Sequence, residues 1–126
     1  MKITKTHSYN IQIWVGLLEN YEEDCVTPST KTKLHTIEEV EGICQRYVNK
    51  EKHCVTVTPT KFIYTGGNEP GAVIGFIQYP RFERHSQTLT NEAIALAEIL
   101  LKKLNQCRIT ITTPDRSIML SKKDCK

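Results

Sequence analysis

The chain has 126 residues and 14.4 kDa, which is room for one domain, because domains cluster at roughly 100–150 residues. With 39% hydrophobic and 25% charged residues, the composition excludes wholesale disorder, and no apolar run approaches the about 18 residues of a membrane span. The net charge of +3 is milder than the dense basic surface typical of a nucleic-acid-binding domain. No apolar stretch follows the basic start at residues 1–5, so no secretory signal is expected. We therefore expect one cytoplasmic domain over residues 1–126.

The first half of the chain predicts a strand, a long loop and a helix. Apolar and polar residues alternate over residues 10–17, which indicates a strand with one buried face. Residues 19–35 are polar and form a loop longer than usual connections, and such loops are often functional. Thr36, with Glu39 three residues later, has the spacing of a capping box at a helix start. An apolar stripe then continues this helix to residue 48.

The middle of the chain predicts two strands joined by a turn. Residues 54–58 are rich in β-formers, and residues 61–64 continue the run after Pro59, which suits an edge strand or a bulge. The segment 66–71, Gly-Gly-Asn-Glu-Pro-Gly, predicts a turn. Residues 72–79 are almost entirely apolar, so this strand is expected at the centre of a sheet.

The C-terminal part predicts a helix and two short strands. Thr88 or Thr90 is the expected cap of the helix, which is apolar around much of its circumference as far as residue 104. Strands are expected at residues 108–112 and 117–120, and a frayed, charged tail at residues 121–126.

The predicted order is strand, helix, strand, strand, helix, strand, strand. This is the ferredoxin-like split-βαβ pattern of an α+β sandwich with an extra C-terminal strand, in which two helices cover one face of an antiparallel sheet. The strand at 72–79 is apolar on both faces, and two helices cannot cover both. We therefore expect self-association to a homo-oligomer to bury the remaining apolar surface.

Catalytic and metal motifs are absent from the sequence. The histidines at positions 7, 35, 53 and 85 have no metal-ligand spacing, and the five cysteines are scattered and odd in number. The carboxylates occur in a loop run and at a helix start, with no pair marked as facing across a cleft. The sequence therefore predicts no metal, no cofactor, no catalytic residues and no enzymatic activity.

The most informative stretch is residues 78–85, Gln-Tyr-Pro-Arg-Phe-Glu-Arg-His. It leaves a buried strand and presents an aromatic ring, two arginines and a histidine just before a helix. A ring can stack on a base, guanidinium groups can fork onto a diphosphate, and a helix start offers free N–H groups to an anion. Arg108 and the turn at residues 113–116 add a second polar cluster. Together they favour a nucleotide-like ligand, so we expect residues 1–126 to form a single ligand-binding domain.

Residues 13–18 and 75–79 resemble the two aromatic strand motifs of RNA-recognition motifs. That resemblance implies that Trp14, Phe76 and Tyr79 stack on RNA bases. The basic residue and glycine that open the second motif are missing here. A single-stranded RNA-binding module is therefore the alternative function, and a nucleic-acid partner is not the favoured one.

The chain also resembles the first-described phage anti-Thoeris sponge family. The resemblance lies in the size, the turn at 66–71, the Tyr-Pro-Arg-Phe exit at 79–82 and the segment 108–119. It implies a homo-oligomeric immune-evasion protein of the host cytoplasm. Such a protein sequesters, without cleavage, a cyclic ADP-ribose-type signal made by TIR-domain defence proteins, or in some relatives a cyclic oligonucleotide.

The same resemblance implies a set of ligand-binding residues. Phe82 would stack on the adenine, and Arg84 and Arg108 would contact the diphosphate. Asn91 and Asp115 would hydrogen-bond the base or the ribose hydroxyls. Met119, at the end of the resembling segment, completes the predicted site.

Overall fold

The computed structural model describes residues 1–19 and 33–122. Within them, five strands, two α-helices and a short 3-10 helix follow the predicted order. The elements are β1 (Ile11–Gly16), α1 (Ile37–Glu51), β2 (Val55–Tyr64), β3 (Gly67–Phe76), η2 (Pro80–Phe82), α2 (Ser86–Lys103), β4 (Arg108–Thr112) and β5 (Ser117–Ser121).

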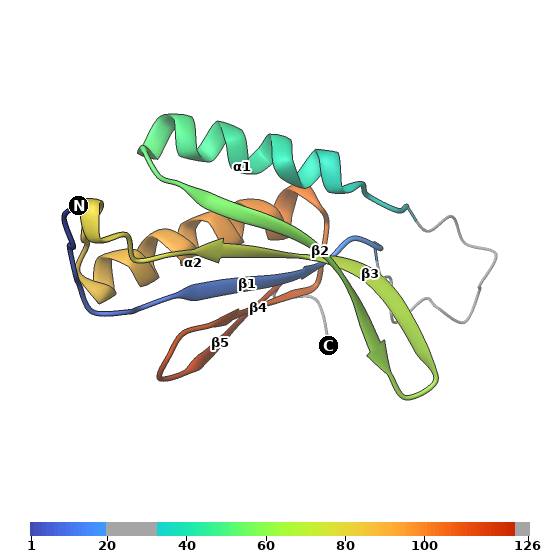
Figure 1. The fold of residues 1–126 in the computed structure, drawn as a ribbon. Coiled ribbons are helices and arrows are strands. Elements are labelled where there is room, and N and C mark those ends of the chain that lie inside the picture. The colour runs from blue at the N-terminus through green and yellow to red at the C-terminus, as the bar shows by residue number, and fades with distance from the viewer. Residues whose placement is uncertain (20–32, 123–126) are drawn as a thin grey trace.

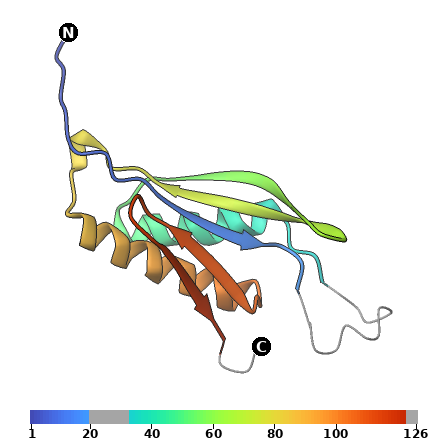
Figure 2. The same ribbon diagram turned by 90° about the horizontal axis from the view of Figure 1, so that it is seen from below.

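The strands form one antiparallel sheet in the order β2-β3-β1-β4-β5. The first four strands in this order have the ferredoxin-like arrangement, and β5 is added beside β4. Both helices lie on the same face of the sheet (Figure 1). Seen from the other side, the second face of the sheet is left uncovered by them (Figure 2). The predicted α+β class and the extra C-terminal strand are confirmed.

Alternation along β1 decides which side chains enter the core. Ile11, Ile13 and Val15 are buried against the helices, where they meet α2 residues such as Leu96 and Leu100. Trp14 lies between them in sequence and therefore points to the opposite, open face of the sheet. The core is thus one layer between the sheet and the helices, and any site on the open face lies outside it.

The predicted start is confirmed for α1 and wrong for α2. The capping box of α1 is confirmed, because the Thr36 side chain accepts from the Glu39 backbone N–H at 3.2 Å and the Glu39 carboxylate accepts from the Thr36 N–H at 2.9 Å. The cap predicted for α2 at Thr88 or Thr90 is wrong. The helix begins earlier, because the ring of His85 accepts a hydrogen bond from the Gln87 N–H at 3.1 Å.

The central hairpin is longer than the sequence predicts. β2 runs unbroken through Pro59, which is tolerated because β2 is an edge strand and pairs with β3 alone. The turn is only Thr65 and Gly66, and Gly66 adopts a positive φ of 84° that suits glycine. The predicted turn at 66–71 is therefore wrong in extent. Residues 67–71 belong to β3, where they continue the open face of the sheet.

Two further predictions fall near the limits of the described residues. Most of the loop predicted at 19–35 lies outside them, at residues 20–32. The tail predicted at 121–126 is corrected at its start, because Ser121 belongs to β5 and the Lys122 N–H donates to the Cys107 carbonyl at 3.0 Å. The rest of that tail lies outside the described residues. In the part of the chain that is described, no helix has the length and apolarity that crossing a membrane requires.

Candidate functional site

Two cavities are lined by four of the six predicted ligand-binding residues. The first, which we call the helix-start cavity, measures about 270 Å³ and lies where β3 leads into η2 and α2. The second, the open-face cavity, measures about 370 Å³ and lies on the uncovered face of the sheet. Its lining residues are Trp14, Gly16, Phe62, Tyr64, Glu69, Gln106, Cys107, Arg108, Ile109, Thr110 and Met119.

The polar groups around the helix-start cavity are satisfied by one another. The Gln78 side chain spans the η2 loop, since its amide N–H donates to the Arg84 carbonyl and its oxygen accepts from the Arg84 N–H at 2.8 Å. The Arg84 guanidinium contacts a Glu92 oxygen at 2.8 Å and the Lys52 carbonyl at 2.9 Å. The arginine that was expected to contact a diphosphate therefore has partners within the protein.

His53 completes this structural cluster. Its ring stacks on Tyr47, meets Phe76 edge to face at 5.4 Å, and its Nε2 lies 2.7 Å from a Glu92 oxygen. Burial and the nearby Arg84 charge lower the pKa of His53, and they outweigh the opposing effect of Glu92. The ring is therefore a neutral core group near neutral pH.

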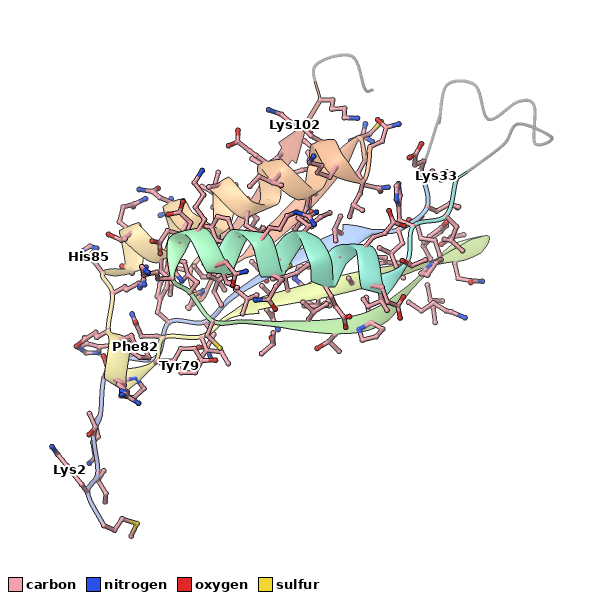
Figure 3. The ribbon with its side chains drawn as sticks, turned by 90° about the horizontal axis from the view of Figure 1, so that it is seen from above. Lys2, Lys33, Tyr79, Phe82, His85 and Lys102 are labelled. Carbon is pink, nitrogen blue, oxygen red and sulfur yellow. The ribbon has the colours of Figure 1, made fainter. Side chains whose placement is uncertain are left out.

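The structure separates the six predicted ligand-binding residues. Phe82 and Arg84 line the helix-start cavity, whereas Arg108 and Met119 line the open-face cavity. Phe82 precedes α2 and Arg108 follows it, and a helix of 18 residues is about 27 Å long. Figure 3 shows Tyr79, Phe82 and His85 at one end of the molecule and Lys102 towards the other. Neither of these two cavities is lined by all six.

The other two predicted residues lie outside both cavities. Asn91 is exposed on α2, where its side-chain oxygen accepts from the Gln87 amide at 3.0 Å. Asp115 is exposed in the turn between β4 and β5, where it accepts from the Thr113 hydroxyl at 2.8 Å. That hydrogen bond is the main cause of the lowered pKa of Asp115. Both side chains thus have local structural partners.

Glycines shape the floor of the open-face cavity. A Cβ atom on Gly71 would lie 2.2 Å from the Phe62 ring, so the missing side chain lets that ring lie close over β3. A Cβ atom on Gly16, which pairs with Gly71 across the sheet, would lie 2.5 Å from a carboxylate oxygen of Glu69. The sheet therefore forms the base of the cavity, and the β2–β3 hairpin forms one wall.

Glu69 is the carboxylate of the open-face cavity. It lies on β3 opposite Phe62 and accepts a hydrogen bond from the Tyr64 hydroxyl at 3.4 Å. Burial raises the pKa of its carboxyl group, although the Tyr64 hydrogen bond acts in the opposite direction. Sequence reasoning missed Glu69 because it assigned residues 66–71 to a turn. The alternation of Phe62 and Tyr64 before the hairpin was the available sign that the strand pairing continues up to the turn and includes Glu69.

Gln106, Trp14 and Arg108 supply the remaining polar groups. The Gln106 amide donates to the Leu18 carbonyl at 3.0 Å, and the Trp14 ring N–H donates to the Thr112 hydroxyl at 3.0 Å. Arg108 is exposed at the end of β4, and no described residue pairs with its guanidinium. The cavity thus combines aromatic rings, one half-buried carboxylate and one available cation.

The described residues were also considered as metal ligands and as reactive cysteines. In the described ranges, no group of three His, Cys, Asp or Glu side chains is placed to hold a metal ion. Cys44 and Cys54 are free thiols, whereas Cys107, at the edge of the open-face cavity, is disulfide-bonded. The sequence analysis did not anticipate this disulfide.

The chain is a two-helix α+β sandwich, and solved structures of a phage enzyme have a similar fold. The structure of a phage SAM lyase in complex with S-methyl-5'-thioadenosine has a TM-score of 0.75 and 14% identity, with 100% of this chain and 98% of that chain covered. The structure of a phage SAM lyase in its apo state has a TM-score of 0.73 and 16% identity, with 94% and 92% covered. No family model matches the sequence. No curated protein matches it either.

These comparisons correct the expectation that the chain is not an enzyme, because the fold that it shares along its whole length is that of a lyase. Trp14, Glu69 and Gln106 line one cavity although they lie far apart in the sequence, so no sequence motif marks this cavity. The RNA-binding alternative is not favoured. Phe76, one of its three stacking residues, is 1% exposed and points into the helix-covered core.

Proposed function

We propose that this chain is a lyase that cleaves S-adenosylmethionine in the open-face cavity. The fold likeness to the phage SAM lyase supports the reaction class, and the carboxylate of Glu69 beside aromatic rings is the observation that carries the assignment to this cavity. The helix-start cavity suits a cationic substrate poorly. Its charged lining residues are the cations Lys52 and Arg84, and no carboxylate lines it.

The groups of the open-face cavity match the parts of the proposed substrate. The faces of Trp14 and Phe62 can receive a sulfonium ion or stack on an adenine ring. Glu69 can bind a positively charged group, and Arg108 can bind the carboxylate of the amino-acid end. A volume of about 370 Å³ lies within the usual range for small-molecule sites.

The reaction can proceed without water. The bond between the sulfonium sulfur and Cγ of the amino-acid chain breaks, and sulfur keeps the electron pair, so neutral methylthioadenosine leaves. A carboxylate oxygen of the substrate forms the new bond to Cγ, which closes a five-membered lactone. Positive and negative charges cancel as the bonds change. A cavity lined by apolar rings, where separated charges are poorly solvated, favours that loss of charge.

The test is to incubate the purified protein with S-adenosylmethionine and to follow methylthioadenosine and the lactone by mass spectrometry. Glu69→Gln should lower the rate at least about 100-fold, because it removes the carboxylate while preserving its shape. Glu98→Gln, at an exposed position of α2, is the matched control and should be unchanged. No methylthioadenosine from the wild-type protein would rule out the proposal. An unsaturated amino acid in place of the lactone would show proton abstraction instead of ring closure.

A cyclic ADP-ribose-type nucleotide is the second ligand to test. The resemblance to the anti-Thoeris family suggests it, and the unpaired guanidinium of Arg108 among the described residues gives a cation for its diphosphate. The measurement is equilibrium binding of a cyclic ADP-ribose isomer to the wild-type protein and to Arg108→Gln. Wild-type binding that Arg108→Gln does not weaken would remove this cavity from consideration for that ligand.

Self-association and a cytoplasmic location remain predictions. Exposed apolar side chains of the open sheet face on β2 and β5 support the first, since Tyr64 is 53% and Met119 60% exposed. A second copy lying over the uncovered sheet face would enclose the open-face cavity. Analytical ultracentrifugation measures the mass directly, and a monomer at all concentrations would contradict the prediction.

A further inference from the structure

The free edge of β2 has two halves with different chemistry. β2 pairs with β3 alone, so its other side is an edge of the sheet. The second half carries Pro59 and Lys61, and proline and lysine commonly keep a sheet edge from pairing. The first half, residues 55–58, is Val-Thr-Val-Thr and carries neither. This half of the edge is therefore open to a further strand.

The register of the hairpin decides which backbone groups of β2 face outward. Tyr64 pairs with Gly67 across a two-residue turn, so these residues exchange backbone hydrogen bonds, and every second pair does the same. Thr56 is thus bonded to β3, whereas Val55 and Val57 direct their N–H and C=O groups away from it. No backbone hydrogen bond from another described residue reaches these outward groups. The edge therefore offers donors and acceptors at alternate residues, which an added strand uses.

A groove between α1 and this edge lies beside the outward groups. It measures about 470 Å³, and its apolar lining comes from Cys44 and Val48 of α1 and from Val55 and Val57 of β2. Glu41 is the carboxylate of the lining. Because α1 and β2 run in opposite directions (Figure 1), Glu41 lies at the end of the groove away from their connection. An added strand would direct alternate side chains into this groove, past an apolar part to an acid.

Residues 1–8, which we call the N-terminal arm, have the matching pattern. The arm contains no helix or strand, and Ile3 is 74% exposed. No backbone hydrogen bond joins the arm to the rest of the described chain. Side chains alternate along an extended segment, so Met1, Ile3 and Lys5 share one side of it. Two apolar side chains followed by a cation are the complement of the groove.

The arm and the open half of the β2 edge lie at the same end of the sheet. Ile11 pairs with Phe76 and Phe76 with Val55, so β1 and β2 begin level with each other on either side of β3. The arm extends away from the domain (Figure 2), and the labelled Lys2 lies well beyond η2 in Figure 3. It therefore does not pair with β2 of its own chain, and two copies that meet at this end can exchange arms.

We propose that the N-terminal arm of one copy adds as a strand to the free edge of β2 in a second copy. Met1 and Ile3 enter the apolar part of the groove, and Lys5 pairs with Glu41. Main-chain hydrogen bonds supply affinity, and the groove selects the alternate side chains. This interface is separate from the open sheet face, and it does not depend on the reaction proposed above.

Sedimentation velocity of full-length variants tests the exchange. Ile3→Asp brings a charge into an apolar groove, and it should raise the dissociation constant of the assembly at least about tenfold. Thr4→Asp puts the same charge on the other side of the arm, and this matched control should change the constant less than about twofold. A wild-type chain that is monomeric at all concentrations, or equal effects of the two variants, would overturn the proposal.

A charge swap tests the pairing of Lys5 with Glu41. Lys5→Glu and Glu41→Lys should each weaken self-association at least about threefold, and the double variant should return to within about twofold of the wild type. Lys2→Glu and Glu38→Lys are the matched controls, because Lys2 lies on the other side of the arm and Glu38 does not line the groove. No recovery in the double variant would overturn this placement of the arm.

A labelled peptide separates arm exchange from association through the open sheet face. A fluorescent peptide of residues 1–8 should bind the full-length Ile3→Asp variant in an anisotropy titration, and the same peptide with Ile3→Asp should not. If the wild-type chain self-associates but the unchanged peptide does not bind, arm exchange is overturned and association through the open sheet face stands. None of these measurements depends on lyase activity.

Discussion

The helix-start cavity and the open-face cavity contain similar residue types but use them differently. Around the first, the guanidinium of Arg84, the ring of His53 and the carboxylate of Glu92 contact one another. In the second, an oxygen of Glu69 and an oxygen of Gln106 both lie close to Gly16, and no described residue pairs with the Arg108 guanidinium. Polar groups that satisfy one another stabilise the fold, whereas convergent unsatisfied groups are available to a ligand.

This difference shows what the local sequence at the start of α2 left open. Residues 78–85 place an aromatic ring and two arginines close together in the chain, and such local density suggests a site. The fold uses one of those arginines to tie Lys52, Glu92 and the η2 loop together. The open-face cavity draws on all five strands of the sheet, so no short stretch of the sequence reveals it.

The largest expected effect tests the structural role of the helix-start cluster. Glu92→Ala leaves Arg84 and His53 without their carboxylate partner, and it should lower the free energy of unfolding by about 2–3 kcal/mol. Urea denaturation measures this loss. Glu98→Ala, on the exposed side of the same helix, should cost less than about 0.5 kcal/mol. Equal effects of the two variants would show that the cluster contributes no special stability.

A smaller effect is expected on ligand affinity, and it shows which of the two cavities binds the ligand. Trp14→Phe removes the hydrogen bond to Thr112 and part of the ring surface, and it should weaken methylthioadenosine binding about tenfold, which is about 1.4 kcal/mol. Phe82→Ala should change it less than twofold, because Phe82 lies at the other end of α2. Calorimetric titration of both variants measures the contrast. The reverse pattern would return the site to the helix-start cavity.

The smallest effect is the pH dependence of stability, which should have opposite signs at the two cavities. The pKa of His53 is lowered in the folded protein, so the unfolded state binds more protons. The contribution of His53 to the stability of the folded protein is therefore lost as the pH falls below about 6.5. The raised pKa of Glu69 means that the folded state binds more protons. The contribution of Glu69 to the stability of the folded protein is therefore lost as the pH rises above 4.5.

Thermal melts between pH 4 and pH 8 measure these contributions. Glu69→Gln should stabilise the protein near neutral pH by up to about 1 kcal/mol and less at pH 4, because it removes a half-buried charge without a cationic partner. His53→Gln should flatten the curve below pH 6.5. A Glu69→Gln variant that is less stable than the wild type at pH 7 would argue against an unsatisfied carboxylate in the cavity.

The sequence by itself determined the elements, their order and the fold class, because these follow from local signals. Alternation in β1 and the capping box of α1 are periodic or short-range patterns, and the structure confirms both. Two predicted element boundaries were wrong, one at the hairpin turn and one at the start of α2. In each case, an interaction that the sequence pattern did not reveal set the boundary. Strand pairing extended β3 through Glu69, and the His85 ring capped α2 before either threonine could.

Only the tertiary structure decided the candidate site. Whether Arg84 binds a ligand or the protein depends on Glu92 and the Lys52 carbonyl, which approach it through packing of α1 and α2. Glu69 and Gln106 lie far apart in the sequence, and both approach Gly16 because antiparallel pairing brings β3 and β4, which Gln106 shortly precedes, to either side of β1. Local propensity cannot encode such a meeting, since it arises from register across strands that are distant in the chain.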